Sequence, residues 1–308
     1  MGHMNRAKLA AHSSVVFALV SACCAQPRDV SERGFDVGEQ SVAVTYGSQD
    51  SGHPAVVSIL TDSVRGESSL LCTGTLVGSR AVLTAAHCLN DVFATPLHIA
   101  FGSDARRPTM TRRVSERYVH PDYRPEPLAD HDLAVLAVES PVPSSFVAFA
   151  HDAPVTDTLV RLVGFGATDS TGASSGKKMM GTARIDEAGT TRFLVTPAPS
   201  LTCFHDSGAP AFAGQGESEK LVGVTTSGRS DCAGFSRFMR VDSYWDGFVL
   251  PNISLAESLP ALPAEPVAIR LGGGCQMKSV GRGALFPTSA TSLGLALIAS
   301  RRRRRTRS

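Results

Sequence analysis

The sequence predicts an all-β fold for the body of this 308-residue chain, between residues 44 and 250. Its apolar residues come in short runs rich in Val, Leu and Thr, and Gly, Ser, Pro or Asp separate these runs, as is typical of strands joined by turns. Few longer segments repeat apolar residues every three or four positions. Many short strands within one body favour a barrel or a sandwich. The expected strands lie within 55–60, 74–85, 133–138, 158–166 and 220–226.

One short helix is expected at the end of this body. Val241, Tyr244, Trp245 and Phe248 recur at intervals that place them on one face of a helix. Several prolines follow over 251–272, and they indicate a linker.

The first 25 residues have the layout of a secretory signal, with two basic residues, an apolar stretch and then small residues. The end of this signal can be interpreted in two ways. Residues 20–23 resemble a bacterial lipobox, in which Cys23 would carry a lipid after cleavage, whereas ordinary signal cleavage would fall near Ala25. Residues 26–43 would then form a propeptide or linker. Both interpretations predict an exported protein.

Residues 273–308 have a different character, because Cys275, an apolar stretch at 284–300 and five arginines follow one another. This order resembles the C-terminal sorting tails of some Gram-negative surface proteins. It implies a protein that is anchored to a membrane or the outer surface, or secreted after processing. A membrane-spanning helix needs about 20 apolar residues, so a 17-residue stretch that contains Pro287 is marginal. The alternative is an arginine run that is solvated or binds nucleic acid.

The distribution of charge argues against nucleic acid as a partner. The chain carries +2, from 30 basic and 28 acidic residues. Ten of the basic residues lie in the terminal segments 1–25 and 273–308, which hold no acidic residue. The body is therefore acidic, at about −8, and an acidic surface repels phosphate backbones. The body has no Cys-x-x-Cys pattern of the kind that binds metal, so we expect no metal site. We also expect a monomer that needs no cofactor.

The body contains four cysteines, Cys72, Cys88, Cys203 and Cys232. An even number in an exported chain predicts two disulfides. Three pairings satisfy this count, and the local ones, 72–88 and 203–232, are the simplest.

Three segments of the body carry residues suited to catalysis. The first is "LTAAHC", in which His87 adjoins a cysteine. A disulfide there would fix the imidazole on a stapled turn, and its ordinary pKa of about 6.5 suits a general base at neutral pH. This hexapeptide and the upstream "CTGTLVGSRAV" resemble the histidine signature of the trypsin/chymotrypsin family.

The second segment is "HPDYRPEPLADHDLAVLAV", where an aspartate precedes an apolar strand. Asp132 matches the family's second landmark, while Asp130 and Asp122 are nearby competitors. In that family the aspartate accepts a hydrogen bond from the histidine ring, holds its tautomer and stabilises the imidazolium.

The third segment is "HDSGAP", against the family pattern Gly-Asp-Ser-Gly-Gly-Pro. Ser207 matches the nucleophile, and His87, Asp132 and Ser207 follow the order His, Asp, Ser of chymotrypsin-like enzymes. The resemblance implies two packed antiparallel six-stranded β-barrels with the triad shared across the cleft, and peptide hydrolysis through an acyl-enzyme. Cys203 and Cys232 match the family's disulfide around the substrate pocket.

The resemblance also implies activation by cleavage. "VTYG" is similar to the mature amino terminus of these proteases, so Val44 would supply the new α-amino group and Asp206 would pair with it. Because Ala43 precedes this bond, the activating enzyme would not be trypsin-like. The alternative is a plain first strand.

The specificity pocket would have Leu201 at its base, where an acidic residue would select Arg or Lys. We therefore expect a neutral substrate residue, apolar or small, before the cleaved bond. Thr226, Ser227 and Gly228 should flank the substrate backbone.

His205 is the main departure from the family pattern, which has glycine there. The backbone N–H groups of His205 and Ser207 would form the oxyanion hole. A residue with a Cβ atom is uncommon at positive φ, although histidine is among those that tolerate it better. Losing one such donor typically costs about 10²–10³ in rate. A catalytically weak or silent surface binding protein is therefore the alternative to an active serine endopeptidase.

Overall fold

The computed structural model describes residues 44–62, 67–92, 95–125 and 129–260. The expected signal segment with Cys23, the segment 26–43 and the C-terminal tail lie outside the described residues. No helix in the part of the chain that the structure describes is long and apolar enough to cross a membrane.

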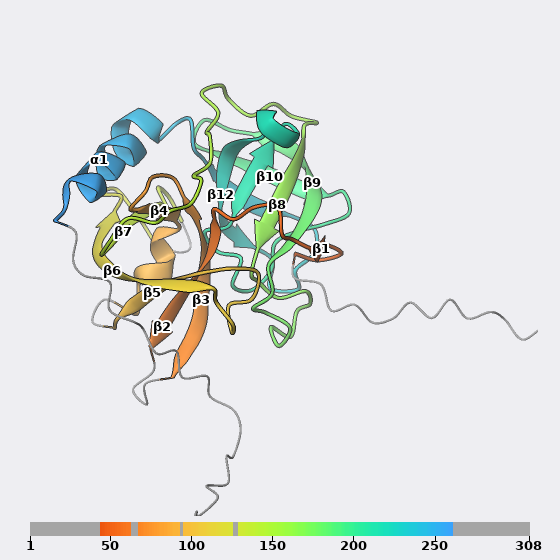
Figure 1. Cartoon of the computed structure of the whole chain (residues 1–308). Coiled ribbons are helices and arrows are strands. Elements are labelled where there is room, and N and C mark those ends of the chain that lie inside the picture. Colours follow the sequence, from red (N-terminus) through yellow and green to blue (C-terminus); the bar gives the residue numbers. More distant parts are fainter. Residues whose placement is uncertain (1–43, 63–66, 93–94, 126–128, 261–308) are drawn as a thin grey trace, which may run out of the picture. The chain divides into compact units, whose positions relative to one another are not determined.

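The first half of the body is a closed antiparallel barrel of six strands, in the order β2-β3-β4-β7-β6-β5 (Figure 1). Its strands are β2 (Val56–Asp62), β3 (Ser68–Leu76), β4 (Ala81–Thr84), β5 (Leu97–Phe101), β6 (Met110–Val119) and β7 (Ala134–Val138).

The second half is also a closed barrel, because β8 pairs with both β9 and β11 and so joins the ends of the sheet. The short β1 (Ser48–Gln49) extends this sheet beside β9. The barrel strands are β8 (Leu159–Gly164), β9 (Met179–Ala188), β10 (Arg192–Pro197), β11 (Pro210–Ala213), β12 (Lys220–Gly228) and β13 (Ser236–Arg240). The predicted two-barrel architecture is confirmed.

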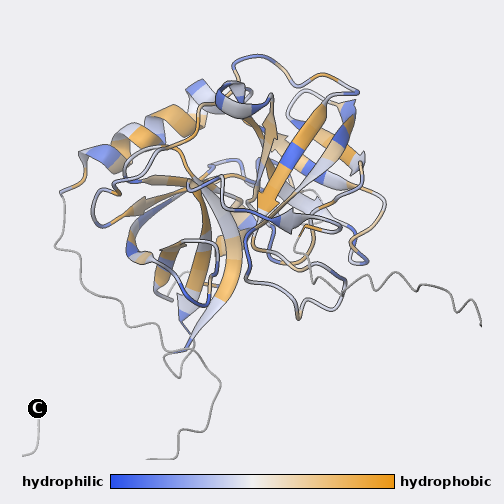
Figure 2. Cartoon of the chain, turned by 45° about the vertical axis from the view of Figure 1, so that its right-hand side comes forward, coloured by the Kyte–Doolittle hydropathy of each residue, from blue (hydrophilic) through white to orange (hydrophobic). Residues whose placement is uncertain are grey.

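Apolar side chains fill each barrel and the layer between them. Hydrophobic residues, orange in Figure 2, recur along the strands of both barrels. Ile59 and Leu97 are fully buried in the first barrel, and Phe238 is fully buried in the second. Each such side chain stabilises the fold by about 1.5–3 kcal/mol. The packed barrels therefore give a rigid base for the loops between them.

The C-terminal helix lies later in the chain than the sequence pattern indicates. A π-helical turn, Trp245–Val249, leads into α1 (Leu250–Ser258), so the first residues of the expected linker are helical. Pro251 does not prevent this, because it lies in the first turn, where its missing N–H is not needed. Helix α1 packs on β4 and β7, and the buried Arg80 donates to the carbonyl of Leu259. The helix thus returns the chain to the first barrel.

Candidate active site

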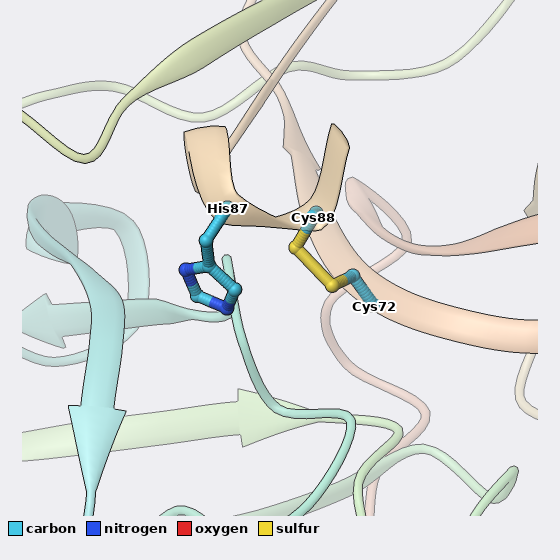
Figure 3. A group of neighbouring side chains, drawn as sticks. All are labelled: Cys72, His87 and Cys88. Atoms are coloured by element: carbon cyan, nitrogen blue, oxygen red, sulfur yellow. A yellow bond between two sulfur atoms is a disulfide. The ribbon is translucent and has the colours of Figure 1, made fainter. Parts of the chain in front are cut away.

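His87 lies on a single 3₁₀ turn, Ala86–Leu89, that follows β4. Figure 3 shows His87 and Cys88 on this turn, with the disulfide joining it to Cys72 of β3. The Cα atoms of the two cysteines are 6.2 Å apart. The three side chains are close enough together to suggest a metal site, but the disulfide consumes both thiols, and a thiolate is the form that binds metal. The disulfide instead fixes the turn that carries His87.

Asp132 is buried immediately before β7 and holds His87 through two contacts. Its Oδ2 atom lies 2.7 Å from Nδ1 of the ring, and its Oδ1 atom accepts the backbone N–H of His87 at 2.8 Å. The hydroxyl of Thr226 donates to Oδ2 as well. Because the carboxylate accepts, Nδ1 carries a proton, and in the neutral form of the ring Nε2 has the lone pair. This is the tautomer that a general base requires.

The two competing aspartates lie elsewhere. Asp130 forms an ion pair with Arg192, with 3.3 Å between Oδ1 and Nη1, and Asp122 is exposed. Neither contacts His87 within the described ranges. Of the three candidates, the structure therefore brings only Asp132 to the histidine.

The turn before Asp132 contains a contact that the sequence pattern did not reveal. His131 has a φ of 52°, which is uncommon for a residue with a side chain. Its ring stacks on His120 with centroids 4.9 Å apart, and its Nδ1 lies 3.1 Å from the hydroxyl of Tyr244. These contacts hold the turn that presents Asp132. One comes from His120, directly after β6, and the other from Tyr244 near the C-terminal helix.

Ser207 lies between the barrels, next to the turn of His87. Its carbonyl oxygen accepts the N–H of Thr73 at 3.0 Å and lies 3.8 Å from Sγ of Cys88. Gly208 follows at a φ of 81°, and a Cβ there would lie 2.3 Å from the carbonyl oxygen of Thr73. Only glycine fits this close approach of the two barrels. The side chain of Ser207 itself is partly exposed.

The backbone at His205 has the positive φ that its position requires, at 69°. The carbonyl of Phe204 accepts the N–H of Ala167 at 2.7 Å, and in a trans peptide the N–H of His205 points the opposite way. Neither this N–H nor that of Ser207 donates to an acceptor in the described part of the chain. These two N–H groups are the donors that the sequence predicts for an oxyanion hole.

Asp206 is fully buried, and its carboxylate accepts the N–H groups of Gly166 and Cys203 at 2.8 and 3.0 Å. Burial raises the pKa of Asp206 to about 7. A Cβ at Gly164 or Gly166 would lie 2.0 or 2.3 Å from this carboxylate, so the "GFG" segment makes room for it. Sequence reasoning missed these glycines, although the "GFG" pattern was visible.

Val44 and Asp206 do not form an ion pair in this uncleaved chain. The carboxylate of Asp206 has no cationic partner among the residues that the structure describes. Val44 is fully buried in the core of the second barrel, in the same cluster as Leu201. The first residue of the expected mature chain is thus held in the core of the second barrel.

Two of the four expected pocket residues, Thr226 and Ser227, line a cavity of about 510 Å³, together with Asp130 and Arg192. Leu201 turns into the core of the second barrel and is 1 % exposed. The sequence could not indicate the orientation of this side chain, because Leu201 lies between strands, where apolar and polar residues do not alternate.

A hydroxyl pair lies beside Leu201 instead. Oγ1 of Thr202 donates to Oγ of Ser236 at 2.8 Å, and both residues are buried. Ser236 is the strand partner of Gly228, and a Cβ on Gly228 would lie 3.4 Å from the serine hydroxyl. Sequence reasoning missed both residues, because the pairing of β12 with β13 brings them to this position.

Both local disulfide pairings are confirmed. Cys72–Cys88 and Cys203–Cys232 are bonded, and the second has a Cα–Cα distance of 5.0 Å. It joins the segment before Ser207 to the loop that follows β12.

Comparison with known proteins agrees with this geometry. The family model for trypsin matches residues 44–246, which is most of the body. The chain belongs to the trypsin family. A protein named trypsin from Saccharopolyspora erythraea is 27% identical over 215 residues, which cover 63% of this chain and 90% of that protein. A venom serine protease from Bombus ignitus is 28% identical over 58% of this chain and 59% of its own length.

A further trypsin-family relative is human granzyme M, which is 34% identical over 113 residues, or 35% of this chain and 44% of its own length. The two longer alignments have identities of 27% and 28%. At the general level these relatives support a serine peptidase.

Proposed function

We propose that this trypsin-family chain is an exported serine endopeptidase in which His87, Asp132 and Ser207 form the catalytic triad. The observation that carries the proposal is the contact between His87 and Asp132. The carboxylate holds the ring by a side-chain contact of 2.7 Å and a backbone contact of 2.8 Å, and Thr226 donates to the same carboxylate. Asp50 holds His53 in a similar way, at 2.7 Å to Nδ1 and 3.2 Å to the backbone N–H. The His87–Asp132 pair differs in its place beside Ser207, whose carbonyl oxygen lies 3.8 Å from Sγ of Cys88, the residue after His87.

In the proposed reaction, Nε2 of His87 removes the proton of Ser207 while the serine oxygen attacks the carbonyl carbon of a peptide bond. The N–H groups of His205 and Ser207 stabilise the negative charge on the carbonyl oxygen. His87 then gives the proton to the leaving amine, and an acyl-enzyme on Ser207 remains. A water molecule, activated by the same histidine, releases the acyl group. No step requires a metal or a cofactor.

The substrate class is a polypeptide with a neutral residue, apolar or small, before the cleaved bond. Leu201 supplies no negative charge for Arg or Lys. The buried hydroxyl pair of Thr202 and Ser236 is likewise uncharged. We expect Thr226, Ser227 and Gly228 to lie along the substrate backbone.

Activation is proposed to follow cleavage before Val44. The new α-amino group would pair with Asp206, whose buried carboxylate lacks a cationic partner within the described residues of the uncleaved chain. Two disulfides in the body support export, because such bonds persist in oxidising compartments. Anchoring to a membrane, through a lipid on Cys23 or through the C-terminal tail, is a separate prediction.

The experiment that tests the function uses full-length protein carrying an inserted cleavage site before Val44. After processing, the parent protein should cut an unfolded protein substrate, and the sequences of the products should show mostly small or apolar residues before the cuts. The matched control is Ser207→Ala, which should not cut. If the folded, processed parent binds polypeptides without cutting them, the surface binding alternative is correct.

A further inference from the structure

His205 occupies a backbone region that favours glycine, with a φ of 69°. The trypsin family's pattern has glycine here, so the side chain of this histidine needs an explanation. The structure gives it two partners on β3, the strand of the first barrel that carries Cys72.

The first partner holds the ring. Nδ1 of His205 lies 3.2 Å from the carbonyl oxygen of Leu71, a residue 134 positions away in the sequence. A carbonyl oxygen only accepts, so Nδ1 carries a proton in this contact. Leu71 is next to Cys72, and the disulfide to Cys88 ties this part of β3 to the turn of His87.

The second partner holds the backbone. The carbonyl oxygen of His205 accepts the hydroxyl of Thr73 at 3.0 Å, and the oxygen of that hydroxyl accepts the N–H of Phe165 at 3.1 Å. Leu71 and Thr73 are two residues apart on β3, so one strand holds the ring and the carbonyl of the same histidine. The peptide between Phe204 and His205 is itself held at its other end, because the carbonyl of Phe204 accepts the N–H of Ala167 at 2.7 Å.

We propose that the imidazole of His205 is a positioning residue, which clamps the oxyanion-hole peptide to β3 of the first barrel. The clamp keeps the N–H of His205 directed towards the nucleophile and offsets the unfavourable φ. This proposal rests on the proposed function, since it assigns a role within the same site. It is the alternative to the expectation that a histidine here weakens the oxyanion hole.

The clamp predicts a specific order of activity among variants of the processed protein. His205→Asn tolerates positive φ and has an amide nitrogen where Nδ1 would be, so it should retain kcat within about threefold of the parent. His205→Gly tolerates the φ but lacks the ring, and its kcat should fall about tenfold. His205→Ala lacks both properties and should lose up to the 10²–10³ that one oxyanion donor is worth, as an order of magnitude.

The kinetic split separates positioning from a general structural defect. Oxyanion hydrogen bonds strengthen in the transition state, so KM should stay nearly constant while kcat falls. Equal melting temperatures across the variants would exclude loss of folding, and the rescue by asparagine keeps the test informative if the alanine variant folds poorly.

Two results would overturn the clamp: a glycine variant as active as the parent, or an asparagine variant no better than alanine. Both require an active parent. A processed parent that neither cuts nor reacts with a serine-directed probe would instead contradict the proposed function itself.

Discussion

His87 and Asp132 are joined by two hydrogen bonds, one from the imidazole Nδ1 at 2.7 Å and one from the backbone N–H of the histidine at 2.8 Å. The first sets the tautomer of the ring, and the second sets the position of the carboxylate relative to the turn. Because the disulfide Cys72–Cys88 fixes that turn as well, the base is restrained from both sides. The proposed chemistry depends on this arrangement.

The first prediction concerns Asp132→Asn. The amide would keep the packing but could donate to Nδ1 and so favour the wrong tautomer, and kcat should fall about 10⁴-fold. The measurement is kcat of the processed protein, with the melting temperature as a control for folding. A variant that retains more than a tenth of the parent's kcat would show that Asp132 does not orient the base.

The second prediction concerns the hydroxyl of Thr226, which donates to the buried carboxylate. Thr226→Val keeps the shape and removes a hydrogen bond to a charged group, which is worth about 1.5–3 kcal/mol. We expect kcat to fall roughly 10- to 100-fold, since about 1.4 kcal/mol corresponds to a factor of ten. Thr226→Ser is the matched control and should stay close to the parent; equal losses in both variants would contradict the role of the hydroxyl.

The third prediction concerns pH and Asp206 in the uncleaved protein. Burial raises the pKa of its carboxyl group from 3.8 to about 7 in the folded state. Between these values the unfolded chain releases a proton that the folded chain keeps, so the contribution of Asp206 to stability is full below about pH 4 and falls as the pH rises to about 7. Asp206→Asn should remove this decline and stabilise the uncleaved protein above pH 7 by an order of a few kcal/mol.

The measurement is urea unfolding from pH 4 to 8, made on the inactive Ser207→Ala background to avoid self-digestion. The difference in the free energy of unfolding between the Asp206→Asn variant and the protein that keeps the aspartate should grow as the pH rises. A difference that stays constant from pH 4 to 8 would contradict a pKa of Asp206 that burial has raised. After processing, and with Ser207 restored, the asparagine variant should be inactive, because it cannot pair with the α-amino group of Val44.

The fourth prediction concerns the disulfide beside His87. Replacing Cys72 and Cys88 by alanine opens a loop with a sequence separation of 16 residues, which should lower the free energy of unfolding by about 3 kcal/mol. Replacing Cys203 and Cys232, with a separation of 29, should cost slightly more. Denaturant unfolding of both double variants tests this, and an unchanged unfolding midpoint in either would contradict it.

The sequence predicted what depends on local pattern. The short apolar runs coincide with strands, and Asp132, chosen from its place before an apolar run, lies 2.7 Å from the ring of His87. The disulfide pairings were among three that the cysteine count allowed, and the local choice is the observed one.

The sequence did not reveal contacts that depend on distant pairing. The ring of His205 reaches Leu71 only because the two barrels pack together, and Thr202 meets Ser236 only because β12 pairs with β13. The side chain of Leu201 lies in the core rather than in a cavity, which no periodic pattern could show for a residue between strands. These contacts therefore follow from long-range packing rather than from local pattern.

The most direct test of the central claim is the labelling of Ser207 by a fluorophosphonate probe. We predict that protein processed at Val44 takes up one probe molecule, that mass spectrometry places it on Ser207, and that Ser207→Ala and His87→Ala abolish the labelling. Folded, processed protein that takes up no probe, or that carries it on another residue, would contradict an activated serine at this site.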